Sequence, residues 1–178
     1  MKLHLGCGND KKEGYINCDI SKEVNPDMII DLNENLPFED NSVNEIITFH
    51  TLEHIKELPK LIGEFKRVCV DGARIKIKVP FYLSHNQFTD PTHVRFFTPW
   101  TFDYFIKGTT LYSLSYEIGL NKGVLMKDNV ILRYGFNNTL ISKHIMNPLM
   151  NLNHRIYCKL FAGIFPASEI EFNLIVKK

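Results

Sequence analysis

The sequence predicts one three-layer α/β domain built on a mostly parallel sheet. A short apolar strand near the N-terminus runs straight into Gly6 and Gly8, where the backbone must bend and approach a ligand closely. Three further short apolar segments each stop at a polar residue, as buried parallel strands do at the ligand edge of a sheet. A segment with helical spacing of its apolar residues follows them. A chain of 178 residues has the size of a single domain, 1–178.

The first four predicted strands are short. After the glycines only about ten residues pass before the apolar stretch Tyr15–Ile20, which is too few for an ordinary crossover helix, so we expect a turn there. Asp27–Leu32 is the third predicted strand, and the following stretch Asn33–Ser42 is dense in turn-forming residues. Val43–Phe49 is the fourth.

An amphipathic helix and a fifth strand complete the first half. The helix is predicted over Glu57–Val70, because its apolar residues recur on one side and would pack on the sheet. Asp71 and Gly72 supply its C-terminal stop. Arg74–Val79 then alternates with period two, as a strand does, until Pro80 ends it.

The second half is rich in aromatic residues between Phe81 and Tyr116, a composition suited to a lid or a pocket wall. Within it, Thr98 and Pro99 predict a helix start, with Thr98 as the N-cap and Pro99 at the first helical position. Asn129–Tyr134 is a sixth predicted strand, and Ile170–Val176 alternates into a final one.

Between these last strands lies an apolar segment, Leu140–Pro166. It is either a helical insertion over about 140–166 that covers the sheet or a surface that touches a membrane or a protein partner. Its basic and histidine residues are Lys143, His144, His154, Arg155 and Lys159.

Composition excludes several classes of protein. The formal net charge of +1, with acids and bases interspersed, argues against a dedicated nucleic-acid binder. The four cysteines form no Cys-x-x-Cys pair, which argues against a zinc ribbon and a disulfide scaffold. No apolar run approaches a membrane span, and no signal segment precedes the first strand. We therefore expect a soluble, cytoplasmic protein, and composition does not predict its oligomeric state.

The glycine loop is an incomplete dinucleotide fingerprint, because Lys11 stands where Gly-x-Gly-x-x-Gly needs its third glycine. Two acids strengthen the interpretation of this loop as a cofactor site. Asp19 and Asp31 close the next two strands, and a carboxylate at the end of a second strand is positioned to accept both hydroxyls of a ribose. The alternative is that each aspartate is only a turn or cap carboxylate.

Four segments follow one another in the first half of the chain. They are Leu3–Gly8, Asn17–Ile20, Asp31-Leu32 followed by Leu36-Pro-Phe-Glu-Asp-Asn-Ser-Val43, and His50–His54. Together they resemble the class I S-adenosylmethionine-dependent methyltransferases, in particular the small bacterial and archaeal methyltransferase-11-like family. The resemblance covers about Lys2 to Val79 and implies a Rossmann-like methyltransferase fold, with a seven-stranded sheet whose last strand is antiparallel. It also implies S-adenosylmethionine as cofactor and S-adenosylhomocysteine as product. Residues 1–80 would then be a cofactor-binding half and 81–178 a lid and acceptor half.

The resemblance also implies which residues bind the cofactor. The glycine loop would wrap the methionine part, Asp19 would bind ribose, Asp31 and Leu32 would face adenine, and His50 would lie by the methionine end. One departure from the family stands inside the first strand, where His4 replaces an acid that many members have, so part of the loop's usual hydrogen-bond support is missing. The implied cofactor-binding residues are Leu5, Gly6, Cys7, Gly8, Asp19, Ile20, Asp31, Leu32 and His50.

The segment Asp90–Pro99 is similar to a motif of bacterial and archaeal members, many of them encoded near surface-polysaccharide genes. This implies O- or N-methylation of a small-molecule or saccharide-type acceptor. An acceptor hydroxyl or amine needs a proton acceptor. We predict His93 for this role, with Asp90 orienting it, in preference to the other candidates. The competing interpretation is that His93 and Arg95 only hold a long loop together. The other candidates are His50, His54 and His85.

Three alternatives remain. His50-Thr-Leu-Glu53-His54 matches the His-x-x-Glu-His pattern of zinc peptidases, but that motif must lie within a helix and here follows a strand. A metal site from His85, Asp90 and His93 has irregular spacing, so we assign no metal ligand. The third is a non-catalytic, cofactor-binding scaffold or regulator with the methyltransferase fold.

Overall fold

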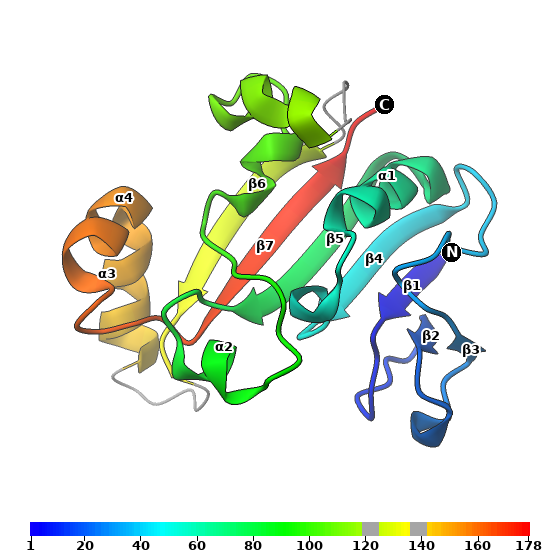
Figure 1. Ribbon diagram of the computed structural model, residues 1–178, viewed down its shortest axis with the longest axis horizontal. Helices are drawn as coiled ribbons and strands as arrows, with labels where there is room; N and C mark the ends of the chain where they lie inside the picture. Colours follow the sequence, from blue (N-terminus) through cyan, green and yellow to red (C-terminus); the bar gives the residue numbers. More distant parts are fainter. Residues whose placement is uncertain (119–124, 136–141) are drawn as a thin grey trace.

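The computed structural model describes residues 1–118, 125–135 and 142–178, which form one seven-stranded sheet in the order β3-β2-β1-β4-β5-β7-β6 (Figure 1). The strands β1 to β5 pair in parallel, whereas β7 is antiparallel to both β5 and β6. The predicted mostly parallel sheet with an antiparallel last strand is thus confirmed. The strand bounds are β1 (Lys2–Leu5), β2 (Ile16–Asp19), β3 (Met28–Ile29), β4 (Val43–Phe49), β5 (Cys69–Pro80), β6 (Leu125–Arg133) and β7 (Glu169–Val176).

The first two connections contain no α-helix, as their lengths predict. Turns join β1 to β2, and only the 3₁₀ turn η1 (Lys22–Val24) lies between β2 and β3. β3 is shorter than the predicted strand Asp27–Leu32. The carboxylate of Asp27 accepts the Asn17 N–H at 2.7 Å, and that of Asp31 accepts the Asn33 N–H at 2.8 Å. On both sides of this short edge strand, aspartate side chains therefore accept backbone N–H groups.

The helix α1 (Leu58–Val68) follows β4 and precedes β5 along the chain. Its apolar side packs on the sheet. Its buried side chains join the same core cluster as the inward-facing residues of the strands. The helix ends at Val68, so the predicted stop at Asp71 and Gly72 is wrong. Cys69 already has the extended conformation, with φ −76° and ψ 148°, because it pairs in the sheet as the first residue of β5.

Charged side chains line the face of the sheet opposite α1. Because side chains alternate along a strand, Ile75 and Ile77 point into the core and Lys76 and Lys78 point to the other face. The two lysine Nζ atoms lie 3.1 and 3.9 Å from the carboxylate of Glu171 in β7. On this face, ion-paired side chains stand where a helix of the expected third layer would pack. The first two connections are too short to carry helices across the sheet.

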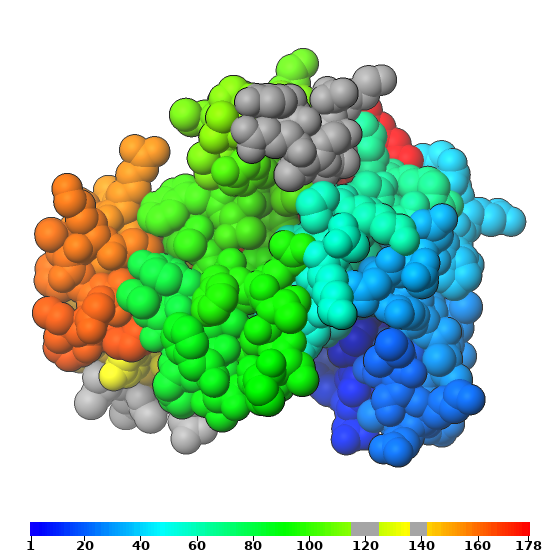
Figure 2. Space-filling view, in the orientation of Figure 1, coloured from blue at the N-terminus to red at the C-terminus, as the bar shows by residue number. Residues whose placement is uncertain are grey.

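The aromatic segment after β5 covers the apolar face, and Figure 2 shows it in green at the front of the molecule. The predicted helix start at Thr98 is displaced to Thr101, where a 3₁₀ helix begins, while Thr98 Oγ1 accepts the Trp100 N–H at 3.3 Å. Phe102 packs edge-on against Phe172 of β7, with ring centroids 4.7 Å apart. The helices of this segment are α2 (His85–Thr89), η3 (Thr101–Phe105) and η4 (Leu111–Ile118).

The segment 142–166 is helical from 142 to 161, in agreement with the predicted insertion, whose first two residues, 140 and 141, lie outside the described residues. Asn151 of α3 accepts the Leu132 N–H and donates to the Leu132 carbonyl, both at 2.8 Å, so α3 closes the edge of β6. Figure 1 shows this helical group beside β6. Its helices are η5 (Ser142–Met146), α3 (Asn147–Leu152), α4 (His154–Ile156) and η6 (Tyr157–Phe161).

Among the described residues no helix is long and apolar enough to cross a membrane. The thiols of Cys7, Cys18, Cys69 and Cys158 are free.

Candidate active site

The glycine loop opens a cavity of about 400 Å³ at the carboxyl ends of the parallel strands. Gly6 and Gly8 both line it, with φ angles of 67° and 49° that favour glycine. A Cβ added to Gly6 would lie 2.1 Å from Thr51 Oγ1, so this glycine is required by packing. A Cβ added to Gly8 would meet nothing within 4 Å, so the backbone at Gly8 is open to a ligand.

Two carboxylates line the same cavity. Asp19 accepts the Gly8 N–H through Oδ2 at 2.8 Å and the Ser21 N–H through Oδ1 at 2.9 Å. Asp31 Oδ1 accepts the Asn33 N–H at 2.8 Å. Asn33 Nδ2 donates to the same Oδ1 of Asp31 at 3.0 Å. Both acids thus make the turn contacts of the alternative interpretation, yet both oxygens of Asp19 and Oδ2 of Asp31 retain lone pairs for a ligand hydroxyl.

His50 lies at the end of β4 with a φ of 51°, an uncommon angle for a residue other than glycine. Its Nε2 is 3.4 Å from Glu169 Oε2, and its Nδ1 is 3.7 Å from Glu53 Oε1. Glu169 and then Glu53 raise the pKa of His50 to about 9, so it carries a positive charge at neutral pH. The peptidase motif is not formed, because His50 ends a strand and the next residues make the 3₁₀ helix η2 (Leu52–His54).

A second cavity of about 370 Å³ adjoins the first. His50 and His54 line both cavities, so any two ligands in them would meet at these histidines. Four of the five predicted candidate groups for proton transfer line this second cavity, whereas His85 does not. The lining residues are His50, Glu53, His54, Pro80, Asn86, Thr89, Asp90, His93 and Ser168.

Comparison with known proteins finds one matching family model. Residues 3–77 are similar to the methyltransferase domain family. This match covers the same part of the chain as the sequence resemblance to methyltransferases that use S-adenosylmethionine. A search of curated proteins finds no match.

Solved structures share the fold of this chain. One is an S-adenosylmethionine-dependent methyltransferase from Archaeoglobus fulgidus, 18% identical with a TM-score of 0.65, covering 99% of this chain and 85% of that one. A second, from Aquifex aeolicus, is 13% identical with a TM-score of 0.54 and coverages of 98% and 81%. A third is a chain from the complex of the Haloferax volcanii Trm112 methyltransferase activator with a methyltransferase, at 13% identity, TM-score 0.59 and coverages of 99% and 82%.

Most of the cofactor residues implied by the resemblance line the first cavity, and two do not. Leu5 is fully buried in the core, and Cys7 is buried with its N–H donated to the Cys18 carbonyl at 3.0 Å. Both residues therefore shape the loop from behind. The cavity also includes residues that the sequence analysis did not assign to the cofactor. Ile30, Asn33 and Thr51 are immediate neighbours of predicted residues, Ile55 lies further along the chain, and His54 was expected only as a candidate for proton transfer.

His4 is buried inside β1, and burial lowers its pKa, so its ring is neutral at neutral pH. A neutral ring cannot supply the negative charge of the acid that many family members have here. The loop is held instead by Asp19, which accepts the Gly8 N–H, and by the backbone bond from Cys7 to Cys18. The hydrogen-bond support missing at His4 is thus partly replaced from β2.

His93 and Asp90 both reach the second cavity, but Asp90 does not orient His93 by a hydrogen bond. The Nδ1 of His93 bonds to the Gln87 carbonyl at 3.0 Å, while Nε2 is 3.9 Å from Asp90 Oδ2. The predicted orienting role therefore belongs to the backbone of α2. Asp90 lies at the cavity's exposed side and is bound by Thr92.

Sequence reasoning missed two acids as site residues. Glu53 appeared only as the base of the peptidase alternative, yet its side chain is buried beside His50 and His93. Glu169 is the first residue of β7. Because β7 runs antiparallel, its first residue lies at the same edge as the carboxyl ends of the parallel strands. That orientation is the signal that would have identified it.

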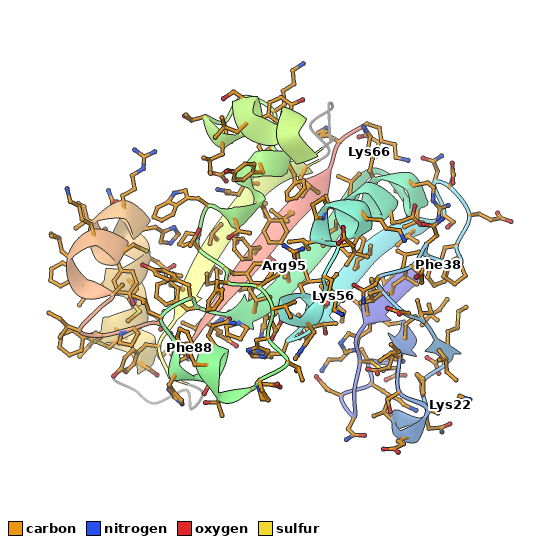
Figure 3. The ribbon with its side chains drawn as sticks, in the orientation of Figure 1. Lys22, Phe38, Lys56, Lys66, Phe88 and Arg95 are labelled. Carbon is orange, nitrogen blue, oxygen red and sulfur yellow. The ribbon has the colours of Figure 1, made fainter. Side chains whose placement is uncertain are left out.

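Arg95 holds the loop in place, as the structural interpretation expects. Its Nε donates to the Ile55 carbonyl at 2.5 Å, and its guanidinium also reaches the Lys56 carbonyl. Figure 3 shows Arg95 and Lys56 close together in front of the sheet. Arg95 lines neither cavity, so it acts by fixing the loop that carries His93.

A larger cavity, of about 900 Å³, lies elsewhere, between residues 98–111 and 155–159. It shares no lining residue with the first or second cavity, so we do not assign the chemistry to it.

Proposed function

We propose that this domain transfers the methyl group of S-adenosylmethionine to an oxygen or nitrogen of a small-molecule or saccharide-type acceptor. The observation that carries the proposal is the junction of the two cavities at His50 and His54. A donor in the first cavity and an acceptor in the second would meet there. The cofactor supplies an electrophilic methyl on a sulfonium, so the protein's main task is to align the reactants and exclude water.

In this proposal the cofactor occupies the first cavity. Its ribose hydroxyls donate to Asp19, its adenine lies by Asp31 and Leu32, and its methionine part follows the open backbone at Gly8. The positive charge of His50 supports this orientation, because it attracts the carboxylate of the methionine part.

The acceptor occupies the second cavity, and His93 takes its proton. The Nδ1 of His93 donates to the Gln87 carbonyl, which leaves the Nε2 lone pair available. Asp90, with its Oδ2 at 3.9 Å from that nitrogen, stabilises the imidazolium that forms. In this proposal His93 keeps its predicted role, whereas Asp90 acts through its charge and not by orienting the ring.

Two measurements test the proposal. The first is calorimetric titration with S-adenosylmethionine. The second is the release of S-adenosylhomocysteine in the presence of a panel of acceptors that carry hydroxyl or amino groups, sugars included. We expect binding, and transfer to at least one acceptor that His93→Gln slows and the control His85→Gln does not. A folded protein that fails to bind the cofactor would overturn the proposal. Binding with no transfer to any acceptor favours the scaffold or regulator alternative.

We further propose that the lobe of residues 142–166 binds an anionic lipid surface. It exposes large apolar side chains, among them Leu152 at 85% and Ile164 at 69% of their surface. The lobe contains no Asp or Glu, and Lys143, Arg155 and Lys159 are exposed on it. Apolar area combined with positive charge suits the boundary of an anionic bilayer better than a neutral protein surface. Figure 2 shows most of this lobe projecting at one end of the molecule, in orange.

A further inference from the structure

Three side chains that can bind a metal ion meet on the wall of the second cavity. Glu53, His54 and His93 each offer one ligand atom, and these atoms lie within 4.8 Å of one another. Two of the residues belong to η2 and the third to the loop after α2. The loop is held against η2 because the N–H groups of Val94 and Arg95 both donate to the Glu53 carbonyl, at 2.9 and 3.2 Å.

The carboxylate of Glu53 lacks a hydrogen-bond partner. Its side chain is 1% exposed, and neither oxygen accepts a hydrogen bond from any described residue. The nearest nitrogen of the charged His50 ring is 3.7 Å away, beyond hydrogen-bond distance. A buried carboxylate that accepts no hydrogen bond is unfavourable, and the His50 charge offsets this only in part because it lies beyond hydrogen-bond distance.

His54 directs a lone pair away from its hydrogen-bonded side. Thr92 Oγ1 donates to the Asp90 carboxylate at 2.6 Å, and this bond helps to lower the pKa of Asp90. With its own proton given to Asp90, the Thr92 oxygen must accept from His54 Nδ1, which lies 2.9 Å away. Nδ1 of His54 therefore carries the proton, and Nε2 is left as an acceptor.

His93 has the same arrangement. Its Nδ1 must donate to the Gln87 carbonyl at 3.0 Å, because a carbonyl only accepts. Its Nε2 lies 3.9 Å from Glu53 Oε1, and in the neutral ring this nitrogen has a lone pair. Histidines that bind metals usually donate the opposite ring N–H to a backbone carbonyl or another acceptor in this way. The cluster thus combines a carboxylate and two imidazole lone pairs, with no donor between them among the described residues.

We propose that Glu53, His54 and His93 bind a divalent transition-metal ion whose open positions face the acceptor cavity. Two imidazoles and one carboxylate are a donor set for zinc and neighbouring first-row metals, and three protein ligands leave room for a substrate. With metal–ligand bonds of about 2.1 Å, ligand atoms around such an ion lie about 3.0 to 4.2 Å apart. The 3.9 Å between Glu53 Oε1 and His93 Nε2 falls in that range. The three ligand atoms lie within 4.8 Å of one another, so small side-chain rotations would bring all of them to binding distance.

This inference rests on the proposed methyl transfer and names how its acceptor is activated. An acceptor hydroxyl bound through its oxygen to the ion loses its proton to water more readily. The oxygen then forms a bond to the methyl carbon as the carbon–sulfur bond breaks, and the electron pair of that bond stays on sulfur. With the ion bound, His93 holds the metal and the ion replaces it as the activating group.

The sequence analysis assigned no metal ligand, and its weaker alternative combined His93 with His85 and Asp90. The structure instead brings Glu53 and His54 to His93. Linear spacing could not indicate this cluster, because its members are separated by about forty residues of helix, strand and loop.

Metal titration of the whole chain tests the inference. Protein treated with a chelator is titrated with Co²⁺ and Zn²⁺, following the visible absorption of bound Co²⁺ and its displacement by Zn²⁺. We expect one ion per chain in the wild type and in the control His85→Gln. Glu53→Gln and His93→Gln should each weaken binding at least about 100-fold, because each removes a ligand.

Calorimetry with S-adenosylmethionine on the same samples separates the two proposals. His93 does not line the cofactor cavity, so His93→Gln should bind the cofactor within about 3-fold of wild type, which also shows that this variant is folded. Glu53→Gln removes a counter-charge of His50, so His93→Gln is the variant that separates metal binding from cofactor binding. Wild-type protein that binds no Co²⁺, or variants that bind it with an unchanged spectrum, would overturn the metal site and leave the methyl-transfer proposal intact. Loss of cofactor binding in the wild type would overturn the methyl-transfer proposal, and the metal titration would still be interpretable.

Discussion

The Nε2 atom of His93 lies 3.9 Å from Oε1 of Glu53, and the two residues come from segments that the fold alone brings together. The buried carboxylate accepts no hydrogen bond from the described residues, and its one charged neighbour among the contacts described above, His50, lies 3.7 Å away. It lies beside the junction of the two cavities, where methyl transfer would take place.

Glu53→Gln should stabilise the metal-free protein or leave its stability unchanged. The substitution keeps the shape of the side chain and removes a buried charge that accepts no hydrogen bond, and the desolvation relieved should equal or exceed the loss of the 3.7 Å attraction to His50, which keeps Glu169 as a partner. Thermal unfolding after chelator treatment measures this, and we expect a Tm equal to or higher than that of the wild type. A Tm lower by more than about 5 °C would mean that the carboxylate has a stabilising partner within the folded chain.

Asp19→Ala should weaken S-adenosylmethionine binding at least about 100-fold, because it removes the proposed ribose acceptor and the bond that holds the Gly8 N–H. Asp27→Ala is the matched control, since Asp27 also accepts backbone and side-chain bonds from Asn17 but does not line the cavity. Calorimetric titration of both variants distinguishes a ligand contact from a turn contact. Equal losses of affinity would assign Asp19 a purely structural role.

Gly6→Ala should be much more destabilising than Gly14→Ala. Both glycines have positive φ angles, 67° and 79°, so an added Cβ strains each of them by about 1 kcal/mol. Only at Gly6 would that Cβ also collide with Thr51, at 2.1 Å. Urea unfolding should show a loss of about 1 kcal/mol for Gly14→Ala and at least about 2 to 3 kcal/mol more for Gly6→Ala. Similar losses would show that Thr51 moves away at little cost.

Glu64→Gln should reduce stability at neutral pH and lose this effect in acid. Arg67 and the Leu36 N–H bond to the Glu64 carboxylate and lower its pKa. A carboxyl whose pKa is depressed by folding contributes stability above its unfolded pKa, and this contribution disappears as the pH falls through the folded pKa. We expect a difference of about 1 to 3 kcal/mol from wild type at pH 7 that shrinks below about pH 4. The same measurement on exposed Glu39→Gln should show almost no difference at either pH.

Vesicle binding by the lobe of residues 142–166 should depend on both lipid charge and apolar surface. The wild type should co-sediment with vesicles that contain phosphatidylglycerol and much less with phosphatidylcholine alone, and added salt should release it. Leu152→Ser combined with Ile164→Ser should reduce binding several-fold, whereas the exposed Leu114→Ser outside the lobe should not. Equal binding to both kinds of vesicle, or no binding to either, would contradict the lipid proposal. The apolar surface would then be assigned to a protein partner.

Local patterns were sufficient for much of the fold. The bends at Gly6 and Gly8, the strand Val43–Phe49 and the alternating final strand each depend on a few neighbouring residues, and each is found in the structure. Element ends were less predictable. Cys69 leaves the helix early because it pairs with a strand distant in the chain, and such pairing has no local signal.

The sequence by itself determined the sheet, the glycine loop and the acids at the strand ends, because strand period, glycine and chain order carry that information locally. Only the tertiary structure decided that Glu53 and Glu169 lie at the site, that Leu5 and Cys7 lie behind the loop, and that the Gln87 carbonyl orients His93. These relationships depend on an antiparallel strand and on a loop folded over η2, both of which join residues far apart in the chain. A buried carboxylate that lacks a hydrogen-bond partner becomes recognisable only when all its neighbours are in place.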